Sequence, residues 1–353
     1  MRKNILFFTV LAAAGLFAAS CNKDIDRVAP KAPEAGIRLA SNAIYFSAGA
    51  ASRSTVDADA SRVQSHGFAV AAAAFDGTPA YYSTYFNRWA SYNAGNSVYL
   101  TPDVYYYPNS GTLSFFAASM NGNATTMEAF DAKNEAGKLS DIAIAISGEG
   151  AATLPWSFSA NDERDLIAAK AEGIAAQSSA QALVFDHVTS QLAFTAVGTD
   201  ANVSYKIKKI GVVSPNSGTY AYAGSSWTRG NELAANYAAC AADAAKYAET
   251  IFVGSDLACS TASAQAIDGS FSFIPGAVKV IIEWECWKDD VLVGSYSREN
   301  AATGISLQQG KKTTINLSLP NDKAKQIKFT ISVNAWGTAS QDITMTPAEG
   351  GEI

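Results

Sequence analysis

Few side chains in this chain have the chemistry that catalysis or metal binding requires. The 353 residues include two histidines, His66 and His187, and four cysteines. A metal site of the usual composition needs several His, Cys or carboxylate ligands that converge, and nothing in the sequence is spaced for one. His187 stands between apolar neighbours, Phe185 and Val188, a setting typical of a packed or capping histidine. We therefore expect no metal and no cofactor.

The densest acidic group is Asp162, Glu163 and Asp165. A glycosidase needs two carboxylates that meet across the scissile bond, but neighbouring acids in a turn more often form a solvated face. No Gly-x-Ser-x-Gly, P-loop or dinucleotide-binding glycine pattern occurs in the sequence. We predict that the chain is not an enzyme.

Cys21 has the setting of a modification site. A basic start at residues 1–3 and an apolar run from Ile5 to Phe17 precede the small residues Ala18, Ala19 and Ser20. This is a signal peptide ending in a lipobox, too short for a comfortable membrane span. Residues 1–21 are then the lipoprotein signal, with the Cys21 thiol carrying diacylglycerol and fatty acyl chains such as palmitate. The alternative is an ordinary secretory signal with an incidental Cys21.

Residues 22–36, with two prolines and mixed charges, are expected to form a tether. Lipid chains at Cys21 would hold the protein at a membrane surface without spanning it.

Three further cysteines remain in the mature chain. In an oxidising envelope one disulfide is possible, and Cys240 with Cys259 would close a short loop and leave Cys286 unpaired. All three are equally compatible with free thiols packed in a core.

The composition predicts a folded, all-β chain. Hydrophobic residues make up 48% and charged residues 16%, so a substantial core can form. A net charge of −6 without any long Lys or Arg block argues against nucleic acid as a partner. Length suggests about two domains at roughly 150 residues each.

The strand pattern gives roughly seven short strands per half without a βαβ rhythm, which favours two β-sandwiches. Residues 183–194 (LVFDHVTSQLAF) are predicted to form an interrupted strand that opens the second domain, giving domains at 37–180 and 181–353. Residues 66–75 should be a strand buried on both faces. We also expect hairpins at 104–119 and across Asp289–Asp290, and a helix within the Ala-rich segment 231–248.

Several pieces of the sequence, taken in order, resemble the fimbrillin family of Bacteroidales lipoproteins, the subunits of type V pili. The pieces are RST at 53–55, VYYYP, LSFFAAS, DLIAAKAEG, LVFDHVTSQLAF, YKIKKIGV with GTY, SFSFIPG, GKKTTINLSL and FTISVNAW. The lipobox and tether complete the pattern, which covers nearly the whole chain. The resemblance implies two transthyretin-like β-sandwich domains in tandem.

The resemblance also implies a mechanism of assembly. Fimbrillins reach the outer membrane and cell surface as lipoproteins, where an arginine- or lysine-specific protease removes the N-terminal segment with its first strand. A strand from a neighbouring subunit then fills the exposed groove by β-augmentation. In this chain the excised strand would lie within residues 37–48, with apolar anchors at Ile37, Leu39, Ile44 and Phe46.

The cut is expected after the strand, with Arg53 the first candidate, Arg38 the second and Arg62 the third. A solvated loop charge is the alternative for Arg53. The donor strand would come from the C-terminal region, where Ile343 and Met345 are the alternating apolar residues. So short an apolar tail suits a tip or accessory subunit as well as a stalk subunit.

Other pilus subunits, a processing protease and a host or bacterial surface ligand are the implied partners. The rival prediction is a surface lipoprotein that never polymerises and binds glycans through the Tyr-rich segment 81–107, with Trp89 as an exposed aromatic. Aromatic stacking on sugars would serve such a role, but core packing is the commoner use of these residues.

Overall fold

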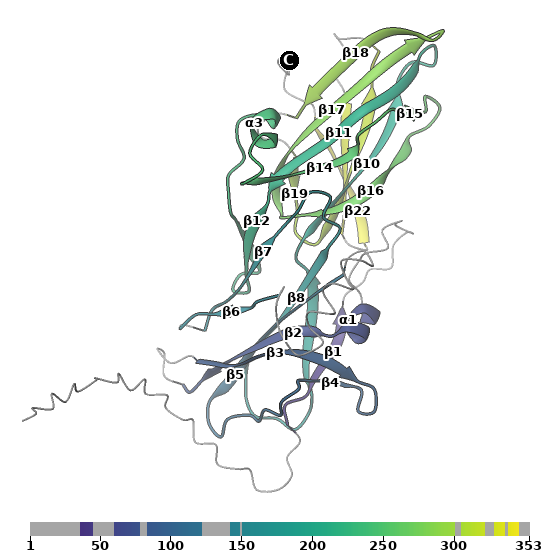
Figure 1. The fold of residues 1–353 in the computed structure, drawn as a ribbon. Helices are drawn as coiled ribbons and strands as arrows, with labels where there is room; N and C mark the ends of the chain where they lie inside the picture. The colour runs from purple at the N-terminus through teal and green to yellow at the C-terminus, as the bar shows by residue number, and fades with distance from the viewer. Residues whose placement is uncertain are drawn as a thin grey trace, which may run out of the picture.

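The computed structural model describes residues 36–44, 60–77, 83–121, 142–148, 150–300, 305–321, 328–335 and 338–345. Cys21, Phe46 and Arg53 lie outside these ranges. Nearly all regular structure is β, as predicted, and the described elements form four sheets (Figure 1).

The first sheet is a closed barrel built mainly from the N-terminal half. Its order is β1-β4-β3-β2-β5-β8-β9. The strands are β1 (Leu39–Ile44), β2 (Phe68–Phe75), β3 (Ser83–Asn93), β4 (Val98–Leu100), β5 (Thr112–Asn121), β8 (Asp165–Ile174) and β9 (Gln181–His187), and the short helix α1 (Ala60–His66) precedes β2.

Strand β2 is buried on both faces, as its unbroken apolar run predicted. Side chains alternate across a strand, so Phe68 and Val70 join one cluster inside the barrel, whereas Ala69 and Ala71 join another outside it. The small alanines allow a second sheet to pack closely on the barrel.

That second sheet is built from both halves of the chain. It has the order β13-β12-β7-β6, formed by β6 (Ala145–Ile146), β7 (Ala152–Ser157), β12 (Ser217–Ala221) and β13 (Ser226–Arg229). Tyr220 of β12 and Tyr222, in the turn after it, belong to the same cluster as Ala69. The β12–β13 hairpin therefore returns from the C-terminal half to cover the barrel.

The passage between the halves lies inside the stretch 183–194, which forms two strands with a break at Val188–Thr189, as predicted. Because β9 pairs with β8 and β1, residues 181–187 complete the barrel. The break at Val188–Thr189 thus separates the last barrel strand from β10 of the C-terminal half, and the domain boundary at 180/181 stays a prediction.

The C-terminal half forms a two-sheet sandwich. One sheet has the order β16-β10-β20-β21-β22; the other has β14-β11-β17-β18, with β15 on β11 and β19 on β17. The strands are β10 (Ser190–Gly198), β11 (Ser204–Pro215), β14 (Tyr247–Val253), β15 (Leu257–Cys259), β16 (Gln265–Phe273), β17 (Gly276–Lys288), β18 (Val291–Glu299), β19 (Ile305–Leu307), β20 (Lys311–Leu319), β21 (Lys328–Ala335) and β22 (Thr338–Met345).

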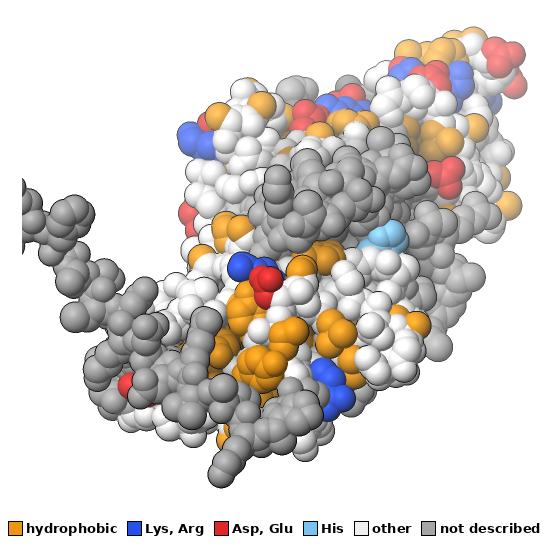
Figure 2. All heavy atoms as spheres, turned by 60° about the horizontal axis from the view of Figure 1, so that its bottom comes forward, with side chains coloured by type: hydrophobic (Ala, Val, Ile, Leu, Met, Phe, Trp, Pro, Cys, Tyr) orange, Lys and Arg blue, Asp and Glu red, His pale blue; other side chains and the backbone are white. Residues whose placement is uncertain are grey.

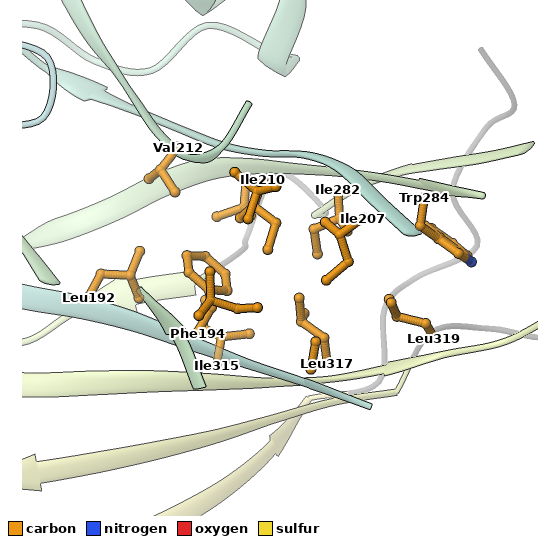
Figure 3. Close-up of a cluster of buried hydrophobic side chains, with 14 of the residues drawn as sticks. Leu192, Phe194, Ile207, Ile210, Val212, Ile282, Trp284, Ile315, Leu317 and Leu319 are labelled. Atoms are coloured by element: carbon orange, nitrogen blue, oxygen red, sulfur yellow. The ribbon is translucent and has the colours of Figure 1, made fainter. Parts of the chain in front are cut away.

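The core of this sandwich lies between the facing sheets. Figure 3 shows side chains of β10 and β20 pointing toward those of β11 and β17. Leu192, Phe194, Ile207 and Ile315 are at most 1% exposed. Their period-two spacing in the sequence is what places them on one face of each strand.

Two expected elements differ in the structure. The Ala-rich segment forms only α3 (Tyr237–Ala241), capped by the Asn236 side chain, because the chain then turns so that Tyr247 can begin β14. Residues 104–107 are not a strand, since β5 is already paired with β2 and β8 on its two edges. The hairpin predicted at 104–119 was therefore wrong, whereas the one across Asp289–Asp290 is confirmed by β17–β18.

Candidate functional site

Strand β1 closes the barrel between β9 and β4. It runs parallel to β9, with Leu39 opposite Gln181, Ala40 opposite Ala182, Ser41 opposite Leu183 and Ile44 opposite Phe185. On its other side only Leu39 has a register partner, Tyr99 of β4. Two flanking bonds support it: Ile37 N donates to Tyr105 O at 2.7 Å, and Gln181 N donates to Arg38 O at 2.8 Å.

Beneath β1 lies an aromatic cluster that this strand helps to cover. Leu39 is 1% exposed and belongs to the cluster of Phe68, Tyr99 and Phe185. The Phe68 ring centroid lies 5.0 Å from that of Tyr99 and 5.3 Å from that of Phe185. Full burial of a leucine side chain contributes about 1.5–3 kcal/mol. Loss of β1 would leave an apolar groove between two strands with unpaired edges.

Of the four anchors predicted for this strand, the structure describes the side chains of two and the backbone of a third. Leu39 is buried and Ile37 is half-buried against the same cluster. The backbone of Ile44 lies opposite Phe185, and Phe46 is outside the described residues.

The candidate cleavage residues differ in their surroundings. The Arg38 guanidinium donates to Ser178 O at 2.7 Å, and its carbonyl accepts from Gln181, so its backbone is held at the start of β1. Arg62 lies in helix α1, whereas Arg53 lies outside the described ranges. A protease needs an extended, accessible backbone, and neither Arg38 nor Arg62 offers one.

The predicted donor segment is β22, the edge strand of its sheet. It pairs with β21 alone, with Ile343 opposite Ile331 and Met345 opposite Phe329. An edge strand exposes unpaired N–H and C=O groups along one side. A strand held along one edge only is also the least costly one to withdraw from a sheet.

The acidic group, expected to be a solvated face, is instead partly buried. Asp165 is 0% exposed and His187 is 7% exposed, and His187 Nδ1 lies 2.9 Å from Asp165 Oδ2. Asp162 is 4% exposed and receives two hydrogen bonds from Arg164 Nε, at 2.9 and 3.1 Å. The partner of Asp165 is 22 residues away in sequence, so no local pattern could reveal the pair.

All three cysteines of the described chain are free and buried. Cys240 packs with Val213 and Tyr237, whereas Cys259 and Cys286 belong to the sandwich core. The disulfide considered between Cys240 and Cys259 is therefore not formed. Burial raises the pKa of each thiol, and that of Cys286 rises to about 11, with the charge of Asp200 adding to the effect of burial.

The aromatic residues considered for glycan stacking mostly pack inward. Trp89 is 6% exposed and its Nε1 donates to His66 O at 2.9 Å. The rings of Phe86 and Tyr105 stack with centroids 4.5 Å apart. Trp89 is thus a core residue, and the expectation that it is exposed was wrong.

Among the residues that the structure describes, no group of three or more His, Cys, Asp or Glu side chains is arranged to hold a metal ion. Within the same ranges, no helix has both the length and the apolar character that a membrane-crossing helix requires.

The chain belongs to the fimbrillin-like family, whose model matches residues 63–336. Strands β1 and β22 both fall outside this match. A comparison with curated proteins gives no match.

Solved structures are similar to this chain over most of its length. A fimbrial protein from Bacteroides vulgatus has a TM-score of 0.56 at 15% identity, covering 85% of this chain and 99% of the other. A protein from Bacteroides ovatus described as a candidate cell adhesion protein has a TM-score of 0.46 at 13% identity, covering 87% and 100%.

Proposed function

We propose that this chain is a structural subunit, in the stalk or at the tip, of a type V-like pilus that serves adhesion. A lipid on Cys21 carries the precursor to the outer membrane surface. A protease then cuts after Arg53, β1 leaves the barrel, and the C-terminal strand of a second subunit takes its place.

The observation that carries this proposal is the position of β1. It is a short strand that follows the N-terminal tether, and it fills the gap between β4 and β9 over an aromatic cluster. Removing it exposes two strand edges and apolar pockets together, the features that β-augmentation uses.

The C-terminal edge strand β22 supports the second half of the proposal. It is joined to its own sheet by β21 alone, and it carries the alternating apolar residues Ile343 and Met345, the kind of anchor that β-augmentation uses. Fimbrillin-like family membership and the fold of a fimbrial protein are consistent with this role.

Limited digestion of the unlipidated protein with an arginine-specific protease tests the proposal. We expect a single cut after Arg53, detected by intact mass, followed by oligomers in gel filtration. Arg53→Ala should remain uncut and monomeric, whereas Arg38→Ala should be cut and assemble as the wild type does. A chain that is cut after Arg53, loses β1 and stays monomeric would refute strand exchange.

A further inference from the structure

Residues 104–107, which follow β4, present two large apolar side chains to solvent. Val104 and Tyr106 are 66% and 42% exposed, whereas Tyr105 and Tyr107 are half-buried against the aromatic cluster inside the barrel. This alternation is that of an extended chain, so the core holds one face of the segment and leaves the other open. The Tyr85 hydroxyl donates to Tyr106 O at 2.6 Å and supports this orientation.

The segment lies at the end of the barrel remote from the C-terminal sandwich. Strand β9 runs toward the sandwich, because it leads through residues 188–189 into β10. Since β1 is parallel to β9 and antiparallel to β4, β1 begins and β4 ends at the remote end. Strand β8 is antiparallel to β9, so the loop 175–180 lies there too. We call the loops 101–111 and 175–180, with the start of β1, the barrel pole.

The barrel pole carries little charge. Among the described residues of its two loops, the one charged side chain is Asp103, and Arg88 Nε lies 3.2 Å from its Oδ2. Asp76 after β2 and Arg38 before β1 are of opposite sign. Figure 2 shows hydrophobic side chains on this end of the molecule with few charged groups among them. A surface of this kind can leave water at little electrostatic cost.

The N-terminal tether enters the fold at the same pole. Ile37 N donates to Tyr105 O at 2.7 Å, and a Cβ added to Gly36 would lie 2.4 Å from Val104 Cγ1. The chain therefore enters directly beside the exposed segment. The tether between Gly36 and Cys21 is short, since even a fully extended chain of that length spans only about 50 Å. A lipid on Cys21 is thus tied to the barrel pole and not to the sandwich.

We propose that the barrel pole of the lipid-anchored precursor lies on the membrane surface, with Val104 and Tyr106 in the headgroup region of the bilayer. The inference rests on the proposed lipidation of Cys21 and goes beyond it, because acyl chains on a tether do not by themselves orient the folded part. Tyrosine suits a membrane surface, since its ring is apolar and its hydroxyl stays hydrated.

The tether makes a weak contact sufficient. An anchored chain meets the lipid surface as an intramolecular partner at high effective concentration. Two exposed side chains can therefore set the orientation, although they are too few to bind a membrane unaided. The C-terminal sandwich then points away from the membrane. Under the proposed processing, the cut that releases β1 also frees the barrel pole from its lipid anchor.

The test uses the full lipidated chain, reconstituted into phosphatidylcholine vesicles that contain a lipid spin-labelled near its headgroup. An environment-sensitive fluorophore is attached through Ser110→Cys, at an exposed position of the barrel pole, or through Val291→Cys near the β17–β18 turn, which Figure 1 shows at the far end of the sandwich. The native thiols Cys240, Cys259 and Cys286 are buried, so the introduced cysteine reacts. We expect the spin-labelled lipid to quench the Ser110 label strongly and the Val291 label weakly.

Matched variants assign the contact to its side chains. Val104→Ser with Tyr106→Ser should lower quenching of the Ser110 label by about threefold or more, since both apolar contacts with lipid are lost. Val291→Ser with Val293→Ser removes exposed apolar surface from the sandwich end and should leave this quenching unchanged. Tyr106→Trp, which keeps an aromatic ring suited to the interface, should retain the quenching.

The outcomes separate lipid anchoring from docking. Failure of the wild-type chain to float with the vesicles would overturn the anchoring, and the docking with it. A chain that floats but shows equal quenching of the two labels would overturn the docking alone, as would unchanged quenching in Val104→Ser with Tyr106→Ser. A Ser110 label that is shielded from water only at high chain density, without quenching by lipid, would assign the barrel pole to a second copy and overturn the lipid contact.

Discussion

His187 Nδ1 lies 2.9 Å from Asp165 Oδ2, and both side chains are almost completely buried where the chain leaves the barrel. Thr189 Oγ1 donates to the other Asp165 oxygen at 3.2 Å. Around this pair, Trp227 Nε1 donates to Val188 O at 2.5 Å and Gly310 N donates to Thr189 O at 2.8 Å. Asp165 therefore anchors the passage between the barrel and the C-terminal sandwich.

Asp165→Asn should lower the free energy of unfolding by about 3 kcal/mol, because it leaves buried partners without the carboxylate that they bind. Urea denaturation followed by Trp fluorescence measures the change. Glu163→Gln, a half-buried neighbour in the same acidic group, serves as the control and should stay within about 0.5 kcal/mol of the wild type. Equal effects of the two substitutions would contradict the anchoring role of Asp165.

Tyr222→Phe tests the hairpin that crosses between the halves. The Tyr222 hydroxyl is buried and donates to Ala117 O of β5 at 2.9 Å. Its loss should lower the free energy of unfolding by about 1–3 kcal/mol, since Ala117 O is left without this donor. Tyr106→Phe, at a side chain that is 42% exposed, should be near neutral. A neutral Tyr222→Phe would argue that the hydroxyl contributes little to holding β12 on the barrel.

Stability should fall with rising pH above about 9 through Cys286. Its folded-state pKa is raised to about 11, whereas an unfolded thiol titrates near 8.5. Between these values the unfolded chain releases a proton that the folded chain keeps, so deprotonation favours unfolding. The contribution is fully present below the unfolded pKa and is lost as pH approaches 11.

Unfolding midpoints measured from pH 8 to 11 check this effect. Cys286→Ala should be less stable than the wild type at pH 8 because of lost packing, but it should show a shallower decline with pH. Parallel curves for the two proteins would contradict the assignment.

Leu39→Ala tests how β1 is retained. Truncating a buried leucine costs about 2–5 kcal/mol, so after the cut at Arg53 the N-terminal fragment should dissociate faster than the wild-type fragment. Ile37→Ala, at a half-buried position, should have a smaller effect. Dissociation followed by gel filtration and mass measures both, and equal release rates would show that backbone pairing alone holds the strand.

The sequence predicted those features that depend on local patterns. Alternation identified the core strands such as β11, the apolar run of β2 showed burial on both faces, and Asp289–Asp290 marked a two-residue turn. The pattern of residues 183–194 also predicted an interrupted strand, and the structure places the interruption at Val188–Thr189. The role of β1 came from the family resemblance and not from its composition.

Features that depend on long-range pairing were not predictable. The burial of Asp165 depends on a histidine in another strand, and the second sheet of the barrel domain depends on a hairpin from beyond residue 216. Trp89 was misjudged because a Tyr-rich segment with Gly and Asn looks like a loop until its strand partners are known. The Ala-rich segment 231–248 has helix propensity, but packing of Tyr237 and Tyr247 limits the helix to five residues.

A disulfide between β1 and β9 gives the most direct test of the central claim that β1 must leave before subunits join. Ala40 and Ala182 are Cα partners in adjacent strands, and neighbouring strands lie about 4.8 Å apart, within the Cα separations that disulfides span. The three native thiols of the described chain, Cys240, Cys259 and Cys286, are buried and should not compete. The chain with Ala40→Cys and Ala182→Cys is cut by the arginine-specific protease with the disulfide oxidised, and again after reduction.

We predict that the oxidised chain keeps its N-terminal fragment and stays monomeric, whereas the reduced chain releases the fragment and assembles as the wild type does. Equal assembly of the oxidised and reduced chains would contradict the account.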